Sequence, residues 1–175
     1  MSRPSPLLAP VLLVLAALSA LLWWWPNRPQ ASDILMPASR FNSVSFAPFR
    51  PGQSPFSDTF PTEAEVDQDA ALVARSSRAI RTYAAIQGDY DIAAIAERHG
   101  LKLWLGIWLG SDRVKNDAEI ARGIALAASH PATVERVIVG NEVLLRRDLP
   151  VPELIAAIDR VRAAVRQPVT EAATP

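Results

Sequence analysis

The chain has 175 residues, a formal net charge of zero, no cysteine and only two histidines. This charge balance gives no support for binding to nucleic acid, and the lack of cysteine excludes disulfides and thiolate metal sites. Because His99 and His130 each lie beside a residue that ends a helix, a histidine-based triad or zinc site is not expected. The sequence implies no metal and no organic cofactor.

An uncharged apolar run covers residues 7–25 (LLAPVLLVLAALSALLWWW). At about 1.5 Å per residue, a helix of this length approaches the hydrocarbon thickness of a bilayer, and three tryptophans at its end resemble an interfacial belt. We predict a membrane anchor, with residues 1–6 in the cytoplasm, a linker rich in proline, serine and alanine at 26–40, and an exported domain at 41–175. A cleavable signal peptide, cut near the small residues at 17–20, is the alternative.

The exported part alternates between β-rich runs and helical runs. The capping-box pattern Thr62-x-x-Glu65 marks the start of one helix, and Gly100 marks the end of another. We expect strands at 41–47, 79–83, 101–109, 135–140 and 168–170, and helices at 62–77, 90–99, from 116 or 117 to before 131, and 152–166. Such repeated βα units predict parallel strands. They fit either an open doubly wound sheet or a closed barrel, and the lack of a glycine-rich phosphate loop disfavours a nucleotide-binding open sheet.

Ligands bind at the carboxyl ends of the strands in both architectures. The predicted strand ends bear aromatic rings, arginines and one carboxylate: Phe46, Arg81, Tyr83, Asn141 and Glu142. Aromatic faces that stack on sugar rings, with arginine and asparagine bonding to hydroxyls, suit a saccharide cleft. Glycoside cleavage needs two carboxylates, and Glu142 is the one good candidate.

The runs FNSVSFAPFR, IRTYA, LKLWLGIWLG and VIVGNEVLLRRDL resemble glycoside hydrolase family 17, especially its bacterial membrane-associated members. The resemblance implies a (β/α)₈ TIM barrel that acts on β-1,3-glucan by retaining chemistry. It implies that Glu142 is the general acid/base, that Asn141 bonds the sugar 2-hydroxyl, and that Tyr83 lies at the cleft. We include Arg81 among the candidate substrate-binding residues, together with Phe46, which stands where related sequences often have tyrosine. The expected location is the bacterial inner membrane, with the catalytic segment on its outer side.

The family nucleophile is a glutamate at the end of strand seven, whereas the predicted strands stop at five. We therefore expect the N-terminal half of a TIM barrel, about four and a half βα units, in which Glu171 does not match the nucleophile motif. The predicted function is a truncated retaining β-1,3-glucan hydrolase. The alternatives are a β-1,3-glucanosyltransferase, a non-catalytic membrane-tethered half barrel or inactive fragment, and an unrelated scaffold of βα repeats.

Several neighbouring side chains have simpler expected roles. Trp104 and Trp108 lie within an apolar strand and are predicted to be core residues. Asp112 is a weaker candidate for a polar contact at the rim, and Arg146 is expected to be solvated or to pair with Asp148.

Overall fold

The computed structural model describes residues 7–28, 40–55, 57 and 59–172. The chain divides into two compact units, residues 1–37 and residues 38–175. The predicted cytoplasmic residues 1–6 lie outside the described residues, as does most of the predicted linker.

The N-terminal unit contains one helix, α1 (Leu8–Asn27), which covers nearly all of the predicted apolar run and continues two residues beyond it. Its length and apolar composition are sufficient to cross a membrane. Just after it, the Arg28 guanidinium lies 4.3 Å from the centre of a Trp25 ring. A cleavable export signal has the same properties, so the helix agrees with both alternatives.

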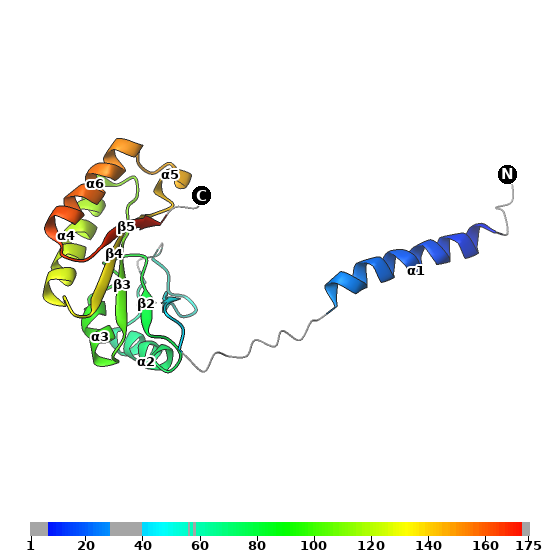
Figure 1. The fold of residues 1–175 in the computed structure, drawn as a ribbon, viewed down its shortest axis with the longest axis horizontal. Coiled ribbons are helices and arrows are strands. Elements are labelled where there is room, and N and C mark those ends of the chain that lie inside the picture. Colours follow the sequence, from blue (N-terminus) through cyan, green and yellow to red (C-terminus); the bar gives the residue numbers. More distant parts are fainter. Residues whose placement is uncertain (1–6, 29–39, 56, 58, 173–175) are drawn as a thin grey trace. The chain divides into compact units, whose positions relative to one another are not determined.

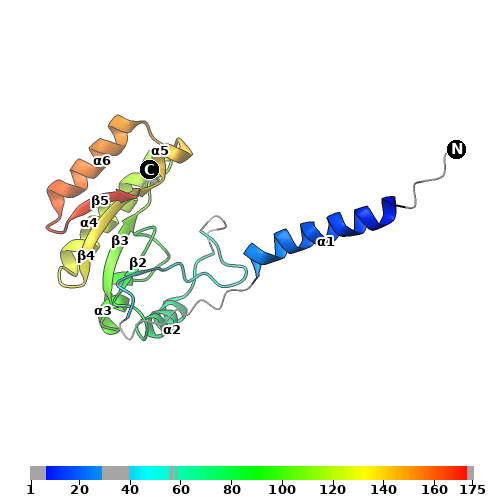
Figure 2. The ribbon, with the colours of Figure 1, turned by 45° about the vertical axis from the view of Figure 1, so that its right-hand side comes forward.

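The second unit is built on a sheet of five parallel strands in the order β1-β2-β3-β4-β5 (Figures 1 and 2). The strands are β1 (Val44–Ser45), β2 (Ala79–Arg81), β3 (Lys102–Ile107), β4 (Val134–Asn141) and β5 (Val169–Ala172). Each new strand is added beside the previous one on the same side. This is the winding of a barrel, because a doubly wound sheet reverses its direction at a switch point.

Helices alternate with these strands: α2 (Glu63–Val73), α3 (Ile92–Arg98), α4 (Arg113–Ser129), the short α5 (Val143–Arg146) and α6 (Val151–Ala164). The predicted capping box is present, since the Thr62 side chain accepts from the Glu65 backbone N–H and the Glu65 carboxylate accepts from the Thr62 N–H. The predicted start of α4 at residue 116 or 117 was wrong. Asp112 caps this helix by accepting from two backbone N–H groups of its first turn.

The hydrophobic core lies between one face of the sheet and the helices. Alternate residues of β3 (Leu103, Leu105 and Ile107) are fully buried, as are Val137 and Val139 of β4. These side chains share a face because successive residues of a strand point to opposite faces. On the opposite face, polar and aromatic side chains of β2, β3 and β4 are half-buried: Arg81, Trp104 and Arg136. The core therefore packs the sheet against the helices, and the residues that could bind a ligand lie at the carboxyl ends of its strands.

Candidate active site

Three of the predicted site residues come together at the carboxyl ends of β2 and β4. The Arg81 guanidinium donates to the Asn141 side-chain oxygen over 2.7 Å, and it lies 4.6 Å from the centre of the Tyr83 ring. Arg81 thus reaches across β3, the strand that separates β2 from β4. The contacts hold one amide, one guanidinium and one phenol ring in a half-buried group that can bond hydroxyls and stack on a sugar.

Gly106 of β3 allows the end of β2 to approach closely. A Cβ at this position would lie only 2.3 Å from the Thr82 carbonyl oxygen, a distance that no real side chain accepts. The Gly106 N–H instead donates to the Thr82 hydroxyl over 3.0 Å. The backbone leading to Tyr83 is therefore set against β3 because residue 106 has no side chain.

Glu142 follows β4 directly and takes an unusual backbone conformation. Its φ and ψ angles are 54° and 31°, in the left-handed region, which a residue other than glycine seldom adopts and which costs about 1–3 kcal/mol. Its N–H donates to the Ala172 carbonyl of β5 over 2.7 Å. The side chain is half-buried and has no hydrogen bond or ion pair to any residue in the described part of the chain. Glu142 is thus fixed through its backbone, which leaves the carboxyl group available to a ligand.

Arg146 joins the carboxyl ends of β3 and β4. Its guanidinium donates to the Leu109 carbonyl over 2.9 Å and to the Asn141 carbonyl. The predicted pairing with Asp148 is present at 2.7 Å. The same guanidinium lies 4.2 Å from the centre of a Trp108 ring, and Trp108 is half-buried rather than a core residue as predicted.

Glu119 of α4 is a buried carboxylate that the sequence did not reveal. Its two oxygens accept from three backbone N–H groups, those of Ala85 at 2.8 Å, Ile86 at 2.9 Å and Trp108 at 3.0 Å. Burial raises the pKa of Glu119 above its ordinary value, against the opposing effect of the three hydrogen bonds. One side chain therefore holds the loop after β2 and the end of β3 together.

The remaining candidates have other roles, although Phe46 and Trp104 neighbour Arg81 in the sheet: the Phe46 N–H donates to the Arg81 carbonyl over 2.8 Å, and Trp104 pairs with Arg81 across β2 and β3. Phe46 is only 5 % exposed and belongs to the core, so its ring presents little surface to a ligand. Asp112 caps α4 rather than serving as a free polar group at the rim. Trp104, predicted to be a core residue, is half-buried and donates to the Glu135 carboxylate over 2.6 Å.

Three other carboxylates lie near the carboxyl ends of the strands. Asp148 is paired with Arg146, and Glu119 is held by backbone groups. Glu171 of β5 packs near Gly140, where an added Cβ would be 3.8 Å from the Glu171 Cγ and 3.4 Å from a Leu154 methyl carbon. This places Glu171 towards α6, and burial raises its pKa.

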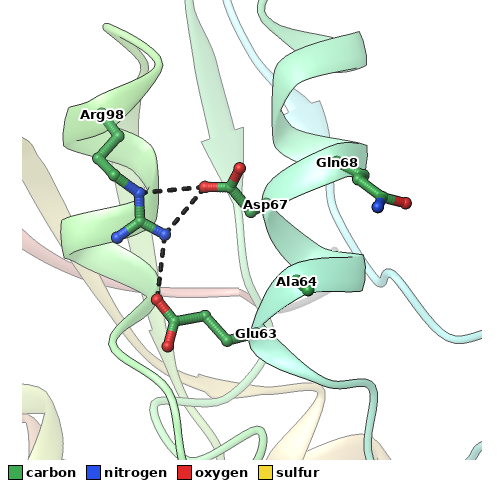
Figure 3. A pocket seen from close by; sticks show the side chains of 5 residues that line it. All are labelled: Glu63, Ala64, Asp67, Gln68 and Arg98. Atoms are coloured by element: carbon green, nitrogen blue, oxygen red, sulfur yellow. Dashed lines mark hydrogen bonds and ion pairs between the residues drawn. The ribbon is translucent and has the colours of Figure 1, made fainter.

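A separate depression lies between α2 and α3 (Figure 3). There Arg98 bonds Asp67 over 2.9 Å and Glu63 over 3.1 Å, and hydrogen bonds from Arg98 and then His99 lower the pKa of Asp67. These side chains pair with one another on an exposed surface, so we assign them no catalytic role. Within the residues that the structure describes, no three His, Cys, Asp or Glu side chains gather closely enough to hold a metal ion.

Comparison with protein families gives a match that covers residues 43–175, to the BtgE/BtgC glycoside hydrolase domain. The chain belongs to this family. A search of curated proteins finds no match. The match includes all five strands and every candidate site residue, so the BtgE/BtgC domain coincides with the second unit of the structure.

Solved structures with the same fold confirm the predicted half barrel. They include an active-site mutant of the Rhizomucor miehei β-1,3-glucanosyltransferase in complex with laminaritriose, at 22 % identity and a TM-score of 0.64 over 77 % of this chain and 50 % of that one. A Formosa endo-laminarinase matches at 20 % identity and a TM-score of 0.57, over 77 % of this chain and 40 % of that one. The glycoside hydrolase family 17 β-1,3-glucanosyltransferase of Rhizomucor miehei matches at 20 % identity and a TM-score of 0.59, over 75 % and 49 %. The chain thus spans about half the length of these proteins or less.

Proposed function

We propose that the BtgE/BtgC domain of this chain is the acid/base-bearing half of a retaining β-1,3-glucan-processing enzyme. The observation that carries the proposal is Glu142: a half-buried carboxylate at the end of β4, with no side-chain partner among the described residues, beside the Arg81–Asn141 group. Active sites of (β/α)₈ enzymes lie at this end of the strands. The similar solved proteins are a β-1,3-glucanosyltransferase and an endo-laminarinase, one of them in complex with laminaritriose.

The proposed roles follow the chemistry of each group. Glu142 protonates the departing glycosidic oxygen and then removes a proton from the incoming hydroxyl. Asn141 bonds the sugar 2-hydroxyl, with its orientation fixed by Arg81, and Tyr83 offers a ring face to a glucosyl unit. Phe46 has no part in this proposal because its ring is buried in the core.

The second carboxylate would come from barrel strands beyond the five described here. In a retaining enzyme it lies about 5–5.5 Å from the acid/base and attacks the anomeric carbon. Whether water or a second glucan then receives the sugar distinguishes the hydrolase from the β-1,3-glucanosyltransferase. We place the domain on the outer side of a bacterial inner membrane, anchored by α1, because the helix is apolar and has three tryptophans close to its C-terminal end.

A second candidate function is glucan binding without catalysis by a membrane-tethered half barrel. The observation in its favour is that Asp148 and Glu119, two carboxylates near the same strand ends, are already engaged by Arg146 and by backbone N–H groups. In this case the Arg81–Asn141–Tyr83 group would bind β-1,3-glucan but leave it unchanged.

The test compares the full chain in detergent with its Glu142→Gln variant, using laminarin and measuring product sizes. The matched control is Asp159→Asn, which removes an exposed carboxylate that pairs with Arg162 on α6. Because the second carboxylate is proposed to lie outside the five described strands, formate is added to every reaction as an external nucleophile. The proposal then expects shorter or longer glucans from the wild type and the control, and at least about a hundredfold loss in Glu142→Gln, in the range for a general acid.

An aryl laminaribioside adds a sharper test, because its leaving phenolate needs little protonation. Glu142→Gln should retain far more of its rate on this substrate in the bond-breaking step than on laminarin. Equal losses on both substrates would contradict the acid role. Laminarin binding without turnover by the wild type would support the second candidate function.

A further inference from the structure

Four contacts of one guanidinium converge beside the proposed acid/base. Arg146 donates to the Asn141 carbonyl, whose peptide bond contains the Glu142 nitrogen. It also donates to the Leu109 carbonyl over 2.9 Å, pairs with Asp148 at 2.7 Å and stacks on Trp108 at 4.2 Å. All four contacts lie at or just beyond the carboxyl ends of β3 and β4, and the guanidinium itself is part-buried.

The backbone at Glu142 needs such support. Its left-handed conformation is unfavourable for a residue other than glycine, and the preceding Gly140 also has a positive φ, of 83°. The glycine accepts this conformation freely, whereas Glu142 keeps it only where surrounding contacts fix the backbone. On one side the Glu142 N–H is held by the Ala172 carbonyl of β5. On the other side Arg146 holds the carbonyl of the same peptide.

We propose that Arg146 is a positioning residue for Glu142: its planar guanidinium fixes the Asn141–Glu142 peptide to the end of β3 and thereby aims the Glu142 carboxyl group. This inference rests on the proposed function and deepens it. Asp148 orients the guanidinium from the other side, and Trp108 supplies a flat surface for it. Lysine cannot replace this group, because an ammonium donates as a point charge and not as a fixed planar fork.

The first test is amide hydrogen exchange of the full chain in detergent, measured residue by residue by NMR. In Arg146→Ala the Glu142 amide should exchange at least about tenfold faster, as expected from the loss of a charged hydrogen bond. The Val139 amide inside β4 should change little, which shows that the fold is retained. Arg166→Ala is the matched control, because Arg166 is exposed and lies beyond the end of α6.

Arg146→Lys and added guanidinium separate positioning from a general structural role. The Glu142 amide of Arg146→Lys should exchange at nearly the same rate as that of Arg146→Ala. Guanidinium chloride, well below denaturing concentrations, should slow the exchange of this amide in Arg146→Ala alone. On laminarin with formate added as the external nucleophile, Arg146→Ala should lower kcat about tenfold or more with little change in KM, because Arg146 positions the acid and is not proposed to touch the glucan.

The exchange result decides the role of Arg146, and the Glu142→Gln result decides the proposed function, so the two can fail separately. Unchanged Glu142 exchange in Arg146→Ala would overturn the positioning role even if laminarin is turned over. Equal acceleration of Glu142 and Val139 would also overturn it, because the effect would then be global. Faster Glu142 exchange with guanidinium rescue would uphold it even if Glu142→Gln were as active as the wild type.

Discussion

Replacement of Glu119 by glutamine keeps the shape of the side chain and removes one of its two acceptor oxygens. The carboxylate accepts from three backbone N–H groups: two of them, Ala85 and Trp108, share Oε2, and Ile86 bonds Oε1. In either orientation the new NH₂ group faces at least one N–H donor. A buried donor left without an acceptor costs about 1–3 kcal/mol, so Glu119→Gln should lower the free energy of unfolding by about that amount. Glu119→Ala, which removes both acceptors, should cost more.

The difference in unfolding free energy between the wild type and Glu119→Gln should change with pH in one direction. Burial raises the pKa of Glu119 in the folded protein above its ordinary value of 4.5, so between these two pKa values the folded state binds more protons than the unfolded state. The stability that Glu119 contributes is then fully present below pH 4.5 and falls as pH rises through the folded pKa, by about 1.4 kcal/mol for each unit of the shift. The unfolding free energy of the wild type minus that of Glu119→Gln should therefore decrease with rising pH.

Urea denaturation followed by tryptophan fluorescence measures this difference, with the full chain in detergent at several pH values. Asp159→Asn serves as the control, because Asp159 is exposed and its pair with Arg162 should contribute less than about 1 kcal/mol. A Glu119→Gln variant as stable as the wild type would refute the assigned hydrogen bonds. A stability difference that grows with pH would show that these bonds outweigh burial in setting the pKa.

Three further substitutions test the elements around the site. Gly106→Ala places a methyl group against the Thr82 carbonyl, which should lower the free energy of unfolding by about 1–3 kcal/mol in thermal denaturation. It should also weaken laminaritriose binding in calorimetry, and unchanged affinity would contradict the role given to this glycine. Thr62→Ala removes the capping box of α2 and should cost about 1 kcal/mol without any change in laminaritriose affinity, so an altered affinity would count against the location of the site. Arg81→Met leaves the Asn141 amide without its donor and should weaken laminaritriose binding about tenfold by calorimetry; equal affinity would remove Arg81 from the site.

Local signals in the sequence predicted local structure well. The capping box at Thr62 and Glu65 is formed as expected. Gly100 has a φ of 64° and follows α3, because a glycine accepts the left-handed conformation that commonly ends a helix. The alternation of strands and helices predicted the parallel sheet, and the position of Glu142 directly after β4 followed from that alternation.

The contacts missed by sequence reasoning join residues that are far apart in the chain. Arg81 and Asn141 were both candidates, but no pattern indicated that one reaches the other across β3. Glu119 lies among buried positions of α4, and only the tertiary structure shows that three N–H groups from two loops face it. Asp112 was interpreted as a rim residue because its capping role depends on where α4 begins, and helix ends are the least certain part of a sequence pattern.

The central claim is that β-1,3-glucan binds at the carboxyl ends of β2 and β4. Titration of the isotopically labelled full chain with laminaritriose, followed by the NMR signals of Tyr83, Asn141 and Glu142, tests it most directly, with cellotriose as the linkage control. We predict that laminaritriose shifts these three residues and leaves the Arg98 region of Figure 3 unchanged, and that cellotriose has a much weaker effect. Shifts confined to the Arg98 region, or no response to laminaritriose, would contradict this account.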